Sequence, residues 1–299
     1  MNMRRFGLLF LIGGMAAQGM AVTLNMSVFS TAHQLPAFSG MTRDRTTGKF
    51  YKIDYWQGPN VIEFNTVGNY QNNVGGTPLA QDDTHLGVYG IVRNGKFFMR
   101  SGMTNATTVN RWDVNSGATE VSATFGTVDP NNGTASFDWG GYSNMNLYDD
   151  PSGIFMLARE TAGNHKIWKL DSNLNILNSY SVSLPTGSDP SPGYAFNVKG
   201  QLFVGQDFFG LNFGTKVDLA TGNTSNVNFT FAGISGFPYI SHIWYDDLAD
   251  RLYLNSTASF STDAIYYLDN AAAQLGVPEP ATLAALGVGL VAMLKRRKK

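Results

Sequence analysis

The sequence contains no cysteine and has only four histidines among its 299 residues. The lack of cysteine excludes disulfides and thiolate chemistry, so the folded chain must be held together by packing alone. The histidines do not show the paired spacing of a zinc site; they are His33, His85, His165 and His242. Phosphate-binding glycine loops and nucleophile elbows in a strand-to-helix setting are also missing. We therefore expect no cofactor and no metal ion.

Positive charge is scarce in the body of the chain. Seven of the 21 basic residues lie in residues 1 to 21 and 281 to 299, which leaves 14 basic against 22 acidic residues, a net charge of −8, for residues 22 to 280. An acidic body argues against nucleic acid, whose phosphates require a basic face, and against electrostatic binding to anionic lipid. The aspartate pairs Asp149-Asp150 and Asp246-Asp247 lack the regular calcium loop, so they do not predict a calcium site.

What the chain does contain is a repeat. A glycine or aspartate leading into an apolar strand recurs at steps of 47, 58, 47 and 50 residues; its positions are Gly48, Gly95, Gly153, Gly200 and Asp250. An apolar residue followed by Asp or Asn recurs in the same phase; those polar residues are Asn65, Asp113, Asp171, Asp218 and Asp269. We interpret the second set as hairpin-turn residues, because an Asp or Asn side chain hydrogen-bonds its own turn backbone.

A period near 47 residues that holds four short strands is typical of a β-propeller blade. We expect an all-β protein with a single propeller over residues 22 to 269 and five four-stranded blades. The aromatic residues within the strands are expected to pack between neighbouring sheets. Residues 22 to 30 resemble the fourth strand of a blade but have no first three strands before them. The last blade, conversely, has no fourth strand of its own. This predicts that residues 22 to 30 pair with residues 264 to 269 and close the ring.

Both ends of the chain have the composition of targeting segments. Residues 1 to 21 combine a basic start, an apolar run and a small-residue exit, as in a secretory signal peptide cleaved after Ala21. At the other end a small-residue linker, residues 270 to 276, precedes Pro278-Glu279-Pro280, an apolar run over residues 281 to 294 and a basic tail. If the run forms a helix, its fourteen apolar residues span about 21 Å, which is shorter than a hydrocarbon core of about 30 Å.

The C-terminal order of motif, apolar segment and basic tail resembles the PEP-CTERM sorting signal, which covers residues 277 to 299 here. The resemblance implies recognition and cleavage near the motif by an exosortase, a membrane-embedded cysteine protease or transpeptidase. It implies an exported protein that contacts the membrane only transiently, through residues 281 to 294. The protein would reside in the cell envelope before processing and at the cell surface or in the extracellular matrix afterwards. The alternative is an ordinary C-terminal membrane anchor.

Ligand-binding candidates lie in loops between second and third strands and between blades, which emerge on one face of a propeller. Exposed aromatic rings beside Asp or Asn suit a sugar, since the ring covers the C–H face and the polar groups bind hydroxyls. Packing of the loops over the ring is the alternative role of the same side chains. The candidates are Trp56, Phe137, Asp138, Trp139, His165, Asp207, Phe208, Phe209 and Phe260.

Two functions are compatible with these features. The first is a non-catalytic surface or matrix module that binds exopolysaccharide or a matrix protein. The second is a glycoside hydrolase or polysaccharide lyase, which requires two carboxylates to converge in the central funnel. Asp138 and Asp207 are the loop acids available for that role. The regular blades and the scarcity of histidine favour the binding module.

Overall fold

The computed structural model describes twelve parts of the chain. They are residues 21–30, 41–54, 60–64, 70–74, 90–100, 107–126, 145–161, 164–185, 194–206, 210–235, 239–259 and 262–277. Within them the secondary structure is almost entirely β-strand. The chain is therefore all-β, as expected. No helix among the described residues is long and apolar enough to cross a membrane.

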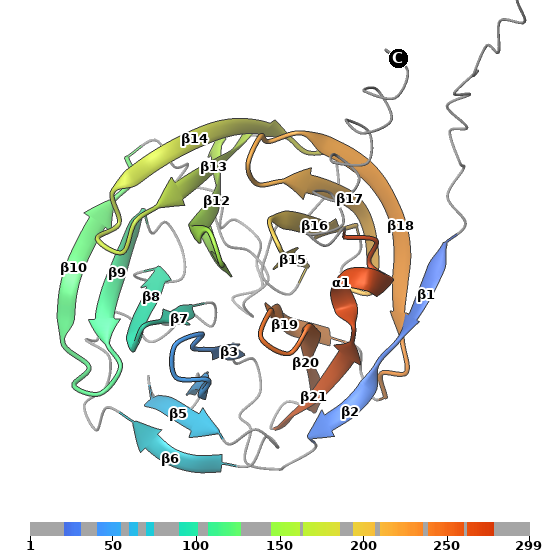
Figure 1. Ribbon diagram of the computed structural model, residues 1–299, viewed down its shortest axis with the longest axis horizontal. Helices are drawn as coiled ribbons and strands as arrows, with labels where there is room; N and C mark the ends of the chain where they lie inside the picture. Colours follow the sequence, from blue (N-terminus) through green and yellow to red (C-terminus); the bar gives the residue numbers. More distant parts are fainter. Residues whose placement is uncertain are drawn as a thin grey trace, which may run out of the picture.

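The described strands form five small sheets that surround a common centre in a propeller-like arrangement (Figure 1). Sheet I consists of β3 (Met41–Arg43), β4 (Phe50–Asp54), β5 (Asn60–Phe64) and β6 (Tyr70–Val74). Sheet II consists of β7 (Ile91–Arg93), β8 (Lys96–Arg100), β9 (Thr108–Asp113) and β10 (Thr119–Thr124). Sheet III consists of β11 (Met145–Asp150), β12 (Gly153–Thr161), β13 (Asn164–Leu170) and β14 (Ile176–Ser183).

The last two sheets take in the N-terminal segment. Sheet IV consists of β15 (Ala195–Val198), β16 (Gln201–Gly205), β17 (Asn212–Asp218) and β18 (Thr224–Ala232), with β1 (Val22–Asn25) added at its outer edge. Sheet V consists of β19 (Tyr239–Asp246), β20 (Arg251–Ser259), β21 (Thr262–Asp269) and β2 (Ser27–Ser30). The innermost strands contact their neighbours in the order β3, β7, β11, β15 and β19, and β19 contacts β3.

The N-terminal segment divides between two sheets. β2 pairs antiparallel with β21, with Ser27 opposite Tyr267, as the sequence predicts. β1, however, pairs in parallel with β18, with Val22 opposite Phe229, so the prediction that all of residues 22 to 30 pair with residues 264 to 269 is wrong for the first half. The chain changes sheets at Met26, whose backbone N–H donates to Ala232 O at 2.8 Å. Alternating hydrophobicity marks a strand but does not specify its partner.

Hairpin turns are built as the repeat predicts. Asp113 Oδ1 accepts backbone N–H groups of Asn115 and Ser116 at 3.0 and 2.8 Å. Asp171 and Asp218 cap the corresponding turns in the same way. Their role as turn residues is confirmed. Asp269 instead pairs with the side chain of Arg251, and Asn65 lies outside the described residues.

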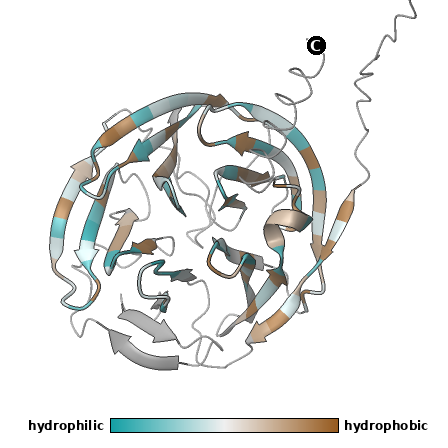
Figure 2. Ribbon diagram, viewed as in Figure 1, coloured by the Kyte–Doolittle hydropathy of each residue, from teal (hydrophilic) through white to brown (hydrophobic). Residues whose placement is uncertain are grey.

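Apolar side chains fill the space between neighbouring sheets. Brown and teal residues alternate along several strands in Figure 2, which is the pattern of a strand with unlike faces. The rings of Trp244 and Tyr253 stack with centroids 4.5 Å apart. The strand aromatics assigned to packing are all buried, as predicted: Phe50, Phe97, Trp112, Phe155, Trp168 and Trp244.

The segment after the last strand is folded onto the body. Residues 270 to 276 are expected to be a linker, but α1 (Ala271–Gln274) buries Ala271 and Ala272 completely, and Val277 is 5% exposed. Their partners include Leu24, Met26 and other side chains of sheets IV and V. Asp250 holds the start of the helix, since its backbone O and its Oδ1 accept the N–H groups of Ala271 and Ala272. Small apolar residues are found both in linkers and in closely packed segments, so the sequence did not distinguish the two.

Candidate functional site

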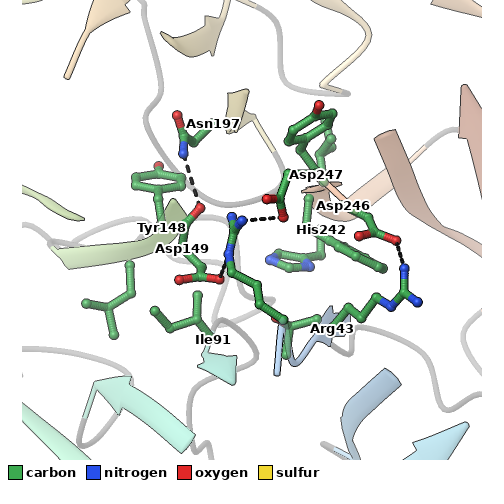
Figure 3. A pocket seen from close by; sticks show the side chains of 14 residues that line it. Arg43, Ile91, Tyr148, Asp149, Asn197, His242, Asp246 and Asp247 are labelled. Carbon is green, nitrogen blue, oxygen red and sulfur yellow. Dashed lines mark hydrogen bonds and ion pairs between the residues drawn. The ribbon is translucent and has the colours of Figure 1, made fainter. Parts of the chain in front are cut away.

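A polar cavity lies at the centre of the ring, between the ends of the innermost strands (Figure 3). Its volume is about 40 Å³. That is room for a few water molecules, whereas sites that enclose a drug-sized ligand occupy about 300 to 1,000 Å³. All five sheets contribute to its lining, which includes Arg43, Arg45, Ile91, Tyr148, Asp149, Asn197, His242, Asp246 and Asp247.

Arg45 joins three sheets at this cavity. It sits in the turn after β3 and forms ion pairs with Asp149 of sheet III and Asp247 of sheet V. Figure 3 labels both carboxylates, Asp149 and Asp247, on opposite sides of the cavity. The side chains of Arg45 and Asp149 are only 15% and 11% exposed. An arginine with two carboxylate partners therefore spans the centre of the ring.

Two further arginines connect sheets around Arg45. Arg93 at the end of β7 donates from Nη1 to Asp149 Oδ1 at 2.7 Å and to the backbone O of Asp150 at 2.8 Å. Arg43 pairs with Asp246, whose side chain is 2% exposed. Each of these contacts joins an innermost strand to one in another sheet. The ion pairs thus link sheets I, II, III and V.

Hydrogen bonds from uncharged donors extend the network. Asn197 on β15 donates from Nδ2 to the backbone O of Asp149 and to Asp150 Oδ2, both at 3.1 Å. Asp44, which is fully buried, accepts the backbone N–H groups of Asn94 and Gly95 at 3.1 and 2.7 Å. These bonds add sheet IV to the network and link sheets I and II directly. A buried polar group is tolerated when it is satisfied in this way.

Burial and ion pairing act in opposite directions on the charges of the cavity. Burial raises the pKa of Asp149 above its ordinary value, although Arg45 and Arg93 act to lower it. Burial alone would lower the pKa of Arg45, but Asp149 and Asp247 outweigh it and the pKa is raised. The carboxylates of Asp149, Asp246 and Asp247 are each paired with an arginine guanidinium group. In the described residues no group of three or more acidic, histidine or cysteine side chains is placed to hold a metal ion.

Most of the ligand-binding residues predicted from the sequence fall outside the described residues. The exception is His165 in β13, half-buried, opposite Arg159 of β12 and Val182 of β14. The others lie in undescribed stretches: Trp56, Phe137, Asp138, Trp139, Asp207, Phe208, Phe209 and Phe260. The sorting motif Pro278-Glu279-Pro280 is also in such a stretch. These assignments stay predictions.

The central network was missed in the sequence. Its signal was present: each first strand has a polar or charged residue at its last or second-to-last position, which is arginine in the first two repeats and Asp or Asn in the others. Opposite charges at corresponding places in a repeat indicate pairing across the ring. His242 is buried and lines the cavity.

Comparison with known proteins identifies a sorting motif and a similarity of fold. Residues 276–299 match the PEP-CTERM protein-sorting motif, so the chain carries that motif. The fold is similar to the crystal structure of glutaminyl cyclase from Myxococcus xanthus, with 10% sequence identity, a TM-score of 0.47, and coverage of 84% of this chain and 99% of that one.

Proposed function

We propose that this chain, which carries a PEP-CTERM sorting motif at residues 276–299, is an exosortase-processed protein of the cell surface or extracellular matrix. Its body is a five-bladed propeller whose ring β2 completes. The body acts as a non-catalytic binding module for exopolysaccharide or for a matrix protein. The motif supports export and processing at the envelope, while the nature of the partner rests on the sequence and on the geometry of the body.

The observation that carries the non-catalytic assignment is the state of the carboxylates in the central cavity. Asp149, Asp246 and Asp247 each pair with an arginine. A glycosidase requires one carboxylic acid to donate a proton and a second to act as base or nucleophile, with space for the sugar between them. A cavity of about 40 Å³ that is lined by arginine side chains offers no such space. The network is better suited to holding the sheets together.

We place the ligand-binding surface on the face of the ring where the second strands end and the third strands begin. Each sheet is also connected to the next on this side. We call it the loop face. Antiparallel order places the first-to-second-strand turns, with Arg45 and Asp247, on the other face. In the sequence Trp56 and Phe208 fall between a second and a third strand, and Trp139 falls between two sheets, so we assign all three to the loop face. A rigid ring that presents aromatic and polar loop residues fits recognition of a neutral glycan.

Alanine substitution of the loop aromatics tests the binding surface. We expect Trp56→Ala, Trp139→Ala and Phe208→Ala to weaken retention of the processed protein on the producing cell's exopolysaccharide. A loss of about tenfold would correspond to the 1.4 kcal/mol expected of one stacked ring. The matched control is Leu248→Ala, which removes an exposed apolar side chain, 55% accessible, from the other face. Unchanged retention in all three loop variants would contradict the proposed surface.

The second candidate function is a glycoside hydrolase or polysaccharide lyase. One observation favours it: burial raises the pKa of Asp149, as the acid of a glycosidase requires, and Asp247 lies across Arg45 in the same cavity. Asp138 and Asp207 are the loop acids available for the same chemistry. An enzyme of either kind must release new chain ends from the polysaccharide. Loss of that release in Asp138→Asn or Asp207→Asn, with binding retained, would establish the catalytic alternative.

A further inference from the structure

The folded body ends very close to the membrane-directed part of the sorting motif. Val277 is buried in the core that joins sheets IV and V, so the body extends to this residue. In the sequence only Pro278, Glu279 and Pro280 separate it from the apolar run that begins at Ala281. Four steps along an extended chain span at most about 14 Å. The headgroup layer on one side of a bilayer accounts for roughly 5 to 8 Å of that distance.

The point at which the C-terminal segment leaves the body lies on one face of the ring. β21 is a third strand and ends at Asp269, on the face of the first-to-second-strand turns. α1 stays on that face, because Asp250 in the β19–β20 turn binds its first residues. Figure 1 shows α1 beside β20 and β21, away from the centre of the ring. We call this the α1 face; the loop face, where the second strands end and the third strands begin, is the opposite one.

We propose that in the unprocessed precursor the α1 face lies against the lipid headgroups and the loop face points away from the membrane. The partner of the α1 face is thus the bilayer surface. The short connection holds Val277 within about 14 Å of the hydrocarbon. A tail of fourteen apolar residues is shorter than the bilayer core by about 9 Å, which draws the body further inward.

An exposed apolar side chain on the α1 face agrees with this orientation. Leu248 is 55% exposed and lies two residues before Asp250, which binds α1. Leucine at that position reaches the interface when the body rests on the membrane, where an apolar side chain is favoured. The body itself is acidic, with a net charge of −8 over residues 22 to 280. Contact between the body and the membrane therefore depends on the short covalent connection to the apolar run and not on attraction to anionic lipid.

The absence of cysteine makes this proposal directly testable. Single cysteines are introduced into the membrane-reconstituted precursor at Leu248 and Ala220 on the α1 face, and at Gln206 on the loop face. Ala220 and Gln206 are both exposed residues of sheet IV, in the β17–β18 turn and just after β16, so they form a matched pair. Each carries a fluorophore, and zwitterionic vesicles contain a lipid with a quenching headgroup. We expect several-fold stronger quenching at 248 and 220 than at 206.

A spacer variant provides the second measurement. Ten Gly/Ser residues inserted between Val277 and Pro278 add a mean reach of about 17 Å. Quenching at position 248 is expected to fall towards the value at position 206. Equal quenching at all three positions, or none at any of them, would overturn the proposal. Quenching at 248 that the spacer leaves unchanged would also overturn it, because the contact would then not arise from the short connection.

Discussion

Arg45 is the side chain whose removal should affect the ring most. It pairs with Asp149 and Asp247 of two other sheets while only 15% exposed. Loss of one partner of a buried ion pair leaves an uncompensated charge, which costs about 3 to 5 kcal/mol. We expect Arg45→Met to lower the free energy of unfolding by about 3 kcal/mol in urea denaturation.

The control for Arg45 is Arg251→Met. Arg251 pairs with Asp269, whose side chain is 51% exposed, and such surface pairs contribute about 0 to 1 kcal/mol. If the two variants unfolded at the same urea concentration, the central network would not stabilise the ring.

Asp113 should make the free energy of unfolding depend on pH in the acid range. The hydrogen bond from Lys96, followed by the backbone N–H of Ser116, lowers the pKa of Asp113 to about 2. A carboxyl whose pKa is lower in the folded state stabilises the protein above the unfolded value of 3.8, and this stability is lost as pH falls through the folded value. The difference in unfolding free energy between the wild type and Asp113→Asn should therefore shrink between about pH 5 and about pH 2. A constant difference over that range would contradict the assignment.

At the scale of elements, the strand β1 depends on a glycine in sheet IV. Gly233 has φ +83°, and a Cβ there would lie 2.6 Å from Met26 O, at the point where the chain passes from β1 to β2. Gly95 has a similar φ of +69° but nothing within 4 Å of its Cβ position. Alanine at Gly95 should cost about 1 kcal/mol for its backbone conformation alone.

Gly233→Ala carries the same backbone cost and displaces β1 as well. We expect its free energy of unfolding to fall by about 1 to 2 kcal/mol more than that of Gly95→Ala, in thermal or urea unfolding. Equal losses would indicate that close contact with Met26 does not hold β1 in place.

Elements governed by local interactions were predictable from the sequence, and those governed by distant contacts were not. The turns at Asp113, Asp171 and Asp218 follow from a side chain bonding backbone groups two or three residues away. The parallel pairing of β1 with β18 joins residues about 200 positions apart and leaves no local pattern. The same holds for Arg45, whose partners belong to other repeats. The loop residues proposed for ligand binding lie outside the described structure, apart from His165.

On the scale of the whole molecule, the sheets form a ring with two unlike faces. One face carries α1 and Val277, which directly precedes Pro278-Glu279-Pro280 in the sequence; on the other face the second strands end and the third strands begin. We propose that attachment at one face leaves the other free to meet polysaccharide or matrix proteins. The ion pairs at the centre join sheets I, II, III and V and engage the carboxylates of Asp149, Asp246 and Asp247. In this proposal, export, attachment and binding belong to separate parts of one chain.

The most direct test is to incubate the processed protein with the producing cell's own exopolysaccharide, to sediment the polymer, and to assay the supernatant of the same tube for new reducing ends and, by ultraviolet absorbance, for unsaturated ends. We expect the protein to sediment with the polymer while neither kind of chain end increases over the protein-free control. Release of chain ends would contradict the non-catalytic assignment in favour of a hydrolase or a lyase. Protein that stays in the supernatant without such release would contradict binding to the polysaccharide.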